Sequence, residues 1–258
     1  MLIKRVTLIY FSPTGGTLGA ARLIAGEFRA PVDEIDITDA REPWARAFGP
    51  EELVVVAAPC YGGRVPAPAA QRLPHFSGRG TPAVAVVAFG NRAYDDALRE
   101  LGDILTGNGF IPVAGAAIVT EHSLARQYGA GRPDESDRAE LRAFAMKVRV
   151  KLGGLERAEQ GRAELGDEAP YRQFGGLPVH PTAGRECTSC GICARVCPAG
   201  AINPVNPARA DGTLCITCMR CVQMCPRGAR SLPRPAHMAI AFKLRGVCAS
   251  RKPNALFM

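Results

Sequence analysis

The chain has 258 residues, of which 47% are hydrophobic, 22% are charged and 10 are cysteine, and its net charge is +8. This length suffices for one ordinary domain and one small domain. No apolar run is as long as a membrane-spanning helix, residues 2–9 are too short and too charged for a signal peptide, and no basic stretch is interleaved with aromatic residues. We therefore expect a cytoplasmic protein with no membrane span and no nucleic-acid partner.

Residues 1–152 alternate short apolar runs with helical patterns, which is typical of a parallel sheet covered on both faces. The expected strands span residues 3–10, 32–37, 53–58, 83–89 and 112–119. The expected helices lie near residues 18–29, 93–108 and 134–152. We predict a doubly wound α/β domain with a five-stranded parallel sheet, whose ligands bind at the carboxyl ends of the strands.

The first expected strand runs directly into a loop of small and hydroxylated residues that precedes a helix. Open backbone N–H groups and the positive end of the helix can hold a phosphate there. The loop lacks the lysine of a Walker loop and the first glycine of a dinucleotide fingerprint, so a terminal monophosphate such as that of FMN fits it better. The alternative is an ordinary turn with a capping hydroxyl. The candidate phosphate-binding residues are Ser12, Thr14, Gly15, Gly16 and Thr17.

Two later strands end in loops that combine glycine with an aromatic residue. Such a loop can stack on a flat ring while its backbone approaches the edge of the ring. Tyr61 and Tyr94 are the candidate stacking residues, and the alternative for either is packing in the core. The full set of candidate ring-binding residues is Pro59, Tyr61, Gly62, Gly63, Gly90, Asn91, Arg92, Tyr94 and Asp95.

Taken together, these three loops resemble those of the flavodoxin family. In that family the phosphate loop has the form Ser/Thr-x-Thr-Gly-x-Thr, and two later loops enclose the isoalloxazine ring. The resemblance implies a flavodoxin-like fold with bound FMN. Gly16 stands where flavodoxins often carry Asn, which removes one side-chain contact. A flavodoxin fold without its flavin is the alternative, because a fold does not guarantee a function.

Three other side chains have two readings each. His122, within Glu121-His122-Ser123 after the fifth expected strand, is either a hydrogen-bonded surface residue or a proton donor to flavin or substrate. Cys60 lies inside a candidate flavin loop, where a small buried hydrophobic side chain explains it as well as a redox role. Cys248 lies outside every motif and is interpreted as having no special role.

Residues 153–180 are rich in glycine, proline and charged side chains, which predicts a connector that is partly helical before Gly166. Residues 236–258 form a tail whose composition suits a helix, and Pro253 would end that helix. The sequence does not decide whether this tail packs on the first domain. Residues 181–258 carry 11 Lys+Arg against 2 Asp+Glu, a balance of +9. Such a basic end suits either counter-charge for metal centres or an acidic redox partner.

Residues 181–235 contain a duplicated cysteine motif with one fixed spacing, Cys-x2-Cys-x2-Cys-x3-Cys-Pro, repeated after 28 residues. In bacterial runs of this kind the fourth cysteine ligates the other cluster. We therefore predict one [4Fe-4S] cluster that is held by Cys187, Cys190, Cys193 and Cys225. The second is predicted to be held by Cys215, Cys218, Cys221 and Cys197.

Two other interpretations of the cysteines explain less. A zinc site needs four ligands and leaves four equally spaced cysteines without a role. A disulfide framework needs an oxidising compartment, to which nothing in the chain directs it. The motif resembles that of bacterial two-cluster ferredoxins, which implies a small α+β domain.

Both halves together resemble the family of fused flavodoxin-ferredoxin iron-sulfur flavoproteins. The resemblance implies an electron-transfer protein that couples two-electron steps at FMN to one-electron steps at two [4Fe-4S] clusters. The implied partner is a redox protein: a ferredoxin, a flavodoxin or an oxidoreductase. Two alternatives are a flavin-dependent reductase of a quinone or nitro compound, with His122 or Arg92 positioning it, and a redox sensor on a flavin-free fold. The sequence identifies no catalytic residue.

Overall fold

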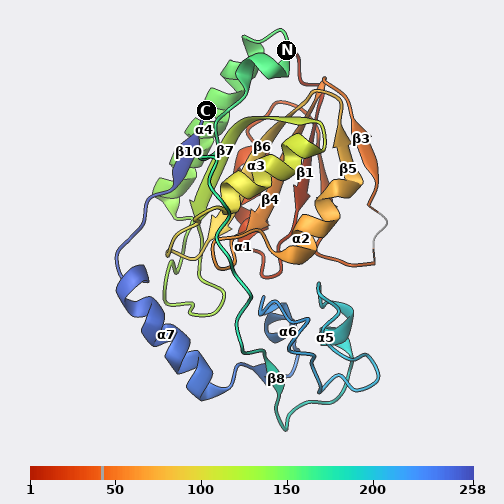
Figure 1. Ribbon diagram of the computed structural model, residues 1–258, viewed down its shortest axis with the longest axis vertical. Helices are drawn as coiled ribbons and strands as arrows, with labels where there is room; N and C mark the ends of the chain where they lie inside the picture. The colour runs from red at the N-terminus through yellow and green to blue at the C-terminus, as the bar shows by residue number, and fades with distance from the viewer. Residues whose placement is uncertain (42–43) are drawn as a thin grey trace.

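The computed structural model describes residues 1–41 and 44–258 and has two lobes (Figure 1). The larger is a sheet covered by helices, which we call the sheet lobe. The smaller contains the duplicated cysteines between Thr182 and Ser231 and is called the cysteine lobe. Helix α7 (Arg234–Cys248) runs alongside both and returns the chain to the sheet. In the described part of the chain no helix is long and apolar enough to cross a membrane.

The main sheet has six strands in the order β10-β7-β6-β4-β1-β2. Five of them are parallel, and β10 pairs antiparallel with β7. If the five parallel strands are numbered by their order along the chain, their order across the sheet is 2-1-3-4-5. This is the flavodoxin-like doubly wound order. The strands are β1 (Arg5–Tyr10), β2 (Val32–Asp36), β4 (Glu52–Pro59), β6 (Thr81–Phe89), β7 (Phe110–Val119) and β10 (Ala255–Phe257).

Helices cover both faces of this sheet. One face carries α1 (Gly16–Ala25) and α4 (Glu135–Gly153), whose apolar residues pack in one core cluster with alternate residues of the strands. The other face carries α2 (Ala67–Arg72) and α3 (Ala97–Gly107), which pack in a second cluster. Strands β6 and β7 are buried at every residue, as expected for strands covered on both sides. The predicted doubly wound fold is confirmed.

The five predicted parallel strands are all present, and a sixth, antiparallel strand that was not predicted extends one edge of the sheet. β10 comes from the tail, and Leu256 lies opposite Ala116 of β7. Pairing with the tail covers an edge that would otherwise expose unpaired backbone groups. The tail therefore does pack on the sheet lobe, and α7 ends at Cys248, five residues before Pro253.

Several short elements are too small to produce a sequence pattern. They are the parallel pair β3 (Arg46–Phe48) and β5 (Phe76–Gly78), and the 3-10 turns Leu73–His75 and Ala158–Gly161. The second turn is the predicted helical part of the connector, which then runs extended to the cysteine lobe.

The cysteine lobe repeats its backbone as well as its sequence. It holds α5 (Ile192–Arg195), α6 (Arg220–Gln223) and the antiparallel pair β8 (Thr182–Ala183) and β9 (Arg230–Ser231). Left-handed residues recur at the 28-residue offset: Ser189 with Thr217, Gly191 with Met219, and Gly200 with Gly228. Equal turns at equal positions give the two halves the same loop geometry.

Candidate functional site

A cleft of about 1080 Å³, open solvent at its mouth included, lies at the carboxyl edge of the main sheet. Loops after β1, β4, β6 and β7 meet there, where the strand order reverses between β1 and β4. Ligands of doubly wound sheets bind at this switch point. The predicted residues that line the cleft are Thr14, Gly16, Thr17, Pro59, Tyr61, Gly62, Gly90 and Arg92.

The loop after β1 is shaped by Ser12 and Gly15, neither of which lines the cleft. The Ser12 hydroxyl accepts the Leu18 N–H at 3.0 Å, and the Ser12 N–H donates to Thr38 Oγ1 at 2.7 Å. Gly15 has φ +87° and forms the cap of α1. The N–H groups at the start of a helix have no partner within it. The loop thus presents Thr14, Gly16 and Thr17 at a helix N-terminus, which suits an anion.

The loop after β4 places Tyr61 between the cleft and the cysteine lobe. Its backbone pairs with that of Arg64, with N–H to O distances of 2.9 and 3.2 Å. Burial raises the pKa of Tyr61 well above its usual value, and the neighbouring Cys218 adds to this effect. Gly62 has φ +61° and contacts the ring of Phe174. Gly63 does not line the cleft. It lies so close to Asp95 that a residue with a side chain would not fit in its place.

The loop after β6 contributes fewer residues to the cleft than predicted. Asn91 is buried and binds the C-terminal segment: its amide donates to the carbonyl oxygens of Cys248 at 2.8 Å and Ser250 at 2.9 Å. Tyr94 packs on Phe89 with ring centroids 5.5 Å apart. Asp95 pairs with Arg92. Gly90 and Arg92 are left as the predicted residues of this loop that line the cleft.

His122, in the loop after β7, lines the cleft, and its hydrogen bonds fix the tautomer of its imidazole ring. Its Nδ1 accepts the backbone N–H groups of Leu124 at 3.1 Å and Ala125 at 3.3 Å. Neutral His122 must therefore carry its proton on Nε2. Burial, followed by the charge of Arg92, lowers the pKa of His122. The side chain is thus a neutral hydrogen-bond donor at pH 7.

Of the two cysteines outside the repeats, Cys248 is buried and Cys60 is half-buried. Cys60 lines the cleft, but its Sγ lies 3.5 Å from the Tyr94 carbonyl oxygen, and burial raises its pKa to about 12. Cys248 is 1% exposed and contacts the Gly90 carbonyl oxygen at 3.8 Å. Both pack beneath the cleft loops, as small hydrophobic side chains do.

Residues from outside the three predicted loops complete the cleft. The connector contributes Phe174 and Leu177, α7 contributes Ile240 and Leu244, and the cysteine lobe contributes Ile216 and Thr217. The sequence held a signal only for Ile216, an apolar residue between two cysteines. The others lie far along the chain and reach the cleft through the docking of the lobes.

The cysteine lobe contains two small cavities, each lined by four cysteines. One, of about 330 Å³ with open solvent at its mouth included, is lined by Cys187, Cys190, Cys193 and Cys225. The other, of about 370 Å³ on the same measure, is lined by Cys215, Cys218, Cys221 and Cys197. These are the two crossed sets that the spacing predicts. Within residues 1–41 and 44–258 no three His, Cys, Asp or Glu side chains are close enough to hold one metal ion. In a cubane, by contrast, each cysteine binds a separate iron.

Backbone N–H groups point at the cysteine sulfurs in both halves. The N–H of Ala201 lies 3.3 Å from Cys197 Sγ, and the equivalent N–H of Ala229 lies 3.3 Å from Cys225 Sγ. Hydrogen bonds of this kind stabilise thiolate ligands and tune the reduction potential of a cluster. The donor set of each cavity thus fits an iron-sulfur cluster.

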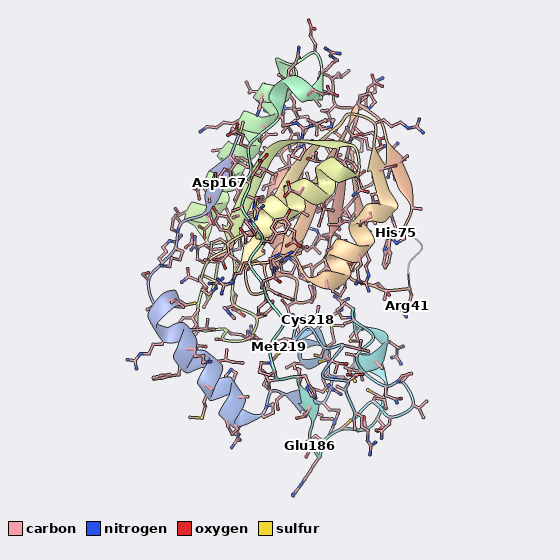
Figure 2. The ribbon with its side chains drawn as sticks, viewed as in Figure 1. Arg41, His75, Asp167, Glu186, Cys218 and Met219 are labelled. Atoms are coloured by element: carbon pink, nitrogen blue, oxygen red, sulfur yellow. The ribbon has the colours of Figure 1, made fainter. Side chains whose placement is uncertain are left out.

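Contacts between the lobes gather around the same cleft. Arg220 of α6 donates to the carbonyl oxygens of Ser12 at 3.3 Å and Pro13 at 3.4 Å. Arg72 of α2 donates to the carbonyl oxygen of Pro198, next to Cys197. Figure 2 shows Cys218 and Met219 on the side of the cysteine lobe that faces the sheet lobe, whereas Glu186 lies at the far end. The second cavity is therefore the one nearer the cleft, and Ile216 lines both.

Comparison with known proteins identifies one part of the chain. Residues 186–230 match the family model of the 4Fe-4S dicluster domain. None of the curated proteins matches the chain. The C-terminal part is thus a small ferredoxin-type domain.

Several solved structures share the arrangement of the sheet lobe. They include a Streptococcus pneumonia TIGR4 flavodoxin (18% identity, 57% of this chain and 99% of that chain, TM-score 0.40). A short-chain flavodoxin associated with a bacterial microcompartment matches at 18% identity, covering 60% of this chain and 100% of that chain, with TM-score 0.40. Rubredoxin oxygen:oxidoreductase from Desulfovibrio gigas matches at 17%, covering 59% of this chain and 38% of that one, with TM-score 0.40. The strand order identifies the fold as flavodoxin-like.

Proposed function

We propose that this protein is an electron-transfer iron-sulfur flavoprotein that passes electrons between FMN in the cleft and two [4Fe-4S] clusters in the cysteine lobe. One observation carries the proposal: Ile216 and Thr217, which lie between cysteines of the second cavity, also line the cleft at the switch point. FMN exchanges one or two electrons, whereas each cluster passes one at a time. A shared wall between the two sites suits direct exchange.

The chain's own residues would hold the flavin at both ends. Thr14, Gly16 and Thr17 offer backbone N–H groups and the positive end of α1 to a phosphate. Tyr61 and Gly62 offer an aromatic face and an open backbone to the ring. Phe174 and Leu244 cover the cleft from the connector and from α7, and so exclude water.

We assign one cluster to Cys187, Cys190, Cys193 and Cys225, and the other to Cys197, Cys215, Cys218 and Cys221. The second cavity is nearer the cleft, so its cluster would exchange electrons with the flavin. The first, toward Glu186, would face a partner. The excess of basic residues in this part of the chain suits an acidic redox protein as that partner.

An anaerobic spectrum and an iron assay of the purified protein, followed by stepwise reduction, test the proposal. We expect flavin absorption, about eight irons per chain and redistribution of electrons between flavin and clusters. Clusters without flavin would contradict the proposal and leave a ferredoxin domain joined to a docking domain, as a sensor would require.

A second candidate is a flavin-dependent reductase of a small acceptor. The observation in its favour is that His122 lines the cleft with a proton fixed on Nε2 and that Arg92 lies beside it. A neutral donor and a cation can together orient a quinone or nitro oxygen. Reduced protein that turns over no such acceptor in a screen would exclude this candidate.

A further inference from the structure

Arg230 is a buried cation at the centre of the cysteine lobe. It is 2% exposed and begins strand β9. The 28-residue repeat places it opposite Ile202, an apolar residue that is 5% exposed. The two halves of the lobe thus differ by a full charge at equivalent buried positions. A buried charge costs free energy unless it is paired, so a specific partner is expected.

The hydrogen bonds of Arg230 leave part of its guanidinium free. Nη1 donates to the carbonyl oxygen of Pro207 at 2.6 Å and contacts Cys193 Sγ at 3.6 Å. Nη2 donates to the carbonyl oxygen of Pro181 at 3.1 Å. The buried Nε has no hydrogen-bond partner among the described residues. Of the five N–H donors of the guanidinium, the Nε–H and one N–H of Nη2 are therefore still available.

No carboxylate in the described residues balances the charge of Arg230. Residues 181–258 contain two acidic side chains: Glu186 pairs with Arg227 at 3.8 Å, and Asp211 binds Thr213 at 2.6 Å. The groups around Arg230 are cysteine sulfurs and backbone carbonyls. Since carbonyl oxygens carry only partial charge, the full counter-charge has to come from the cysteine sites.

Arg230 also lies between the two sites. It lines the cavity of Cys193 and the cavity of Cys221, and it is the residue that both cavities share within the described part of the chain. A cubane held by four thiolates is an anion, and its sulfurs accept hydrogen bonds. A cation at this position is next to both anionic sites at once.

We propose that Arg230 is the shared counter-cation of the two clusters and holds both reduction potentials above the values that an apolar residue would allow. The inference rests on the two clusters of the proposed function, and it assigns to one residue the tuning of both. Reduction adds negative charge to a cluster, so a nearby cation stabilises the reduced state and raises the potential. The free Nε–H acts in the same direction if a cluster sulfur accepts it.

Mediated redox titration of the whole protein, monitored by electron paramagnetic resonance, tests the proposal. In Arg230→Met, a neutral side chain of similar length, we expect both cluster potentials to become more negative. A tenfold change in the equilibrium constant for electron exchange with a reference couple corresponds to 59 mV for one electron, and we expect at least that. Arg230→Lys keeps the charge but loses the planar fork, and its shift should be smaller.

Arg209→Gln is the matched control, because it removes the same charge from an exposed position in the same lobe. Its potentials should equal those of the unmodified protein. Potentials of Arg230→Met that match those of the unmodified protein would overturn the proposal. If Arg230→Met loses its iron but Arg230→Lys keeps it, the result supports the need for a positive charge at this position. Loss of iron from both variants would overturn the proposal in favour of a packing role for Arg230.

The iron content of the unmodified protein separates this proposal from the proposed function. A protein without two clusters fails at that first assay, before Arg230 is altered. A protein with two clusters but no flavin still allows both potentials to be measured through mediators. The potentials of the variants therefore decide the role of Arg230 independently of any electron exchange with FMN.

Discussion

Arg220, one residue before Cys221 of the second cysteine cavity, donates a hydrogen bond to the carbonyl oxygen of Ser12 in the loop between β1 and α1. The repeat places Arg220 opposite Ile192, which lines the other cavity and has an apolar side chain that cannot donate a hydrogen bond. Arg220 thus docks the second copy of the motif on the sheet lobe. Because Cys221 lines the cavity nearer the cleft, Arg220 links that cavity to the loop between β1 and α1.

Arg220→Met should loosen the docking of the lobes. Hydrogen bonds from a charged donor contribute about 1.5–3 kcal/mol, and two carbonyl oxygens would lose theirs. We expect faster amide hydrogen exchange in residues 12–17 and slower transfer of electrons between flavin and clusters. Arg195→Met is the control, since Arg195 is an exposed cation in the equivalent helix α5. Equal exchange rates in both variants would show that Arg220 does not hold the lobes together.

The crossed cysteine sets predict the outcome of two double substitutions. Cys197→Ala with Cys221→Ala removes two ligands from one cavity, so about four of the eight irons should remain. Cys193→Ala with Cys197→Ala removes one ligand from each cavity, although both lie in the same copy of the motif, and we expect both clusters to be impaired. Iron assay and electron paramagnetic resonance distinguish the two. The reverse pattern would mean that each copy of the motif holds its own cluster.

Gly62→Ala should weaken flavin binding. Gly62 has φ +61°, and an added Cβ would lie 2.3 Å from the ring of Phe174. A non-glycine residue in this conformation costs about 1–3 kcal/mol, and displacement of Phe174 would open the cleft. Gly19→Ala is the control, because its Cβ meets nothing within 4 Å in helix α1 and should stabilise the fold by about 0.5–1 kcal/mol. Flavin affinity is measured by fluorescence titration.

Asn91→Ala tests whether Asn91 contributes to the stability of the fold or to flavin binding. Asn91 accepts the Lys252 N–H at 3.0 Å in addition to its two bonds to carbonyl oxygens, and so holds the chain between α7 and β10. Loss of these buried partners should lower the free energy of unfolding by about 1–3 kcal/mol and leave flavin affinity unchanged. Thermal unfolding and flavin titration provide the two readouts. Lost affinity at unchanged stability would instead favour the sequence-based prediction that Asn91 contacts the ring.

His122 predicts a pH dependence of stability. Burial, with the charge of Arg92, lowers its pKa below the usual 6.5. The unfolded chain therefore binds a proton more readily than the folded chain, and stability falls as pH drops below 6.5 until the folded pKa is passed. His122→Asn should flatten this part of the profile, because it removes the titrating imidazole. The free energy of unfolding of the unmodified protein and of the variant, measured at pH 7 and at about pH 5.5, tests this prediction.

Some features of this protein follow from local patterns, and the sequence alone determined them. The apolar runs of β1, β4, β6 and β7 and the glycine-rich loop before α1 depend on neighbours in the chain, so the doubly wound sheet was predictable. The identical spacing of eight cysteines likewise predicts two crossed ligand sets, which line two separate cavities. Periodicity and turn chemistry carry such information because each element forms from contiguous residues.

Other features depend on contacts between distant segments, and only the tertiary structure decided them. The tail becomes a sixth strand because the edge of β7 is open to it, and Asn254 accepts the Val119 N–H at 2.9 Å. The sequence predicted that Asn91 contacts the flavin ring. In the fold its buried side-chain amide instead bonds to backbone groups of the C-terminal segment, because buried polar groups need hydrogen-bond partners. Phe174 and Ile216 reach the cleft through docking, and Arg230 faces both cysteine cavities because the two halves of the repeat fold around it. None of these contacts leaves a periodic signal, since the partners are separated by many residues and meet only in the folded chain.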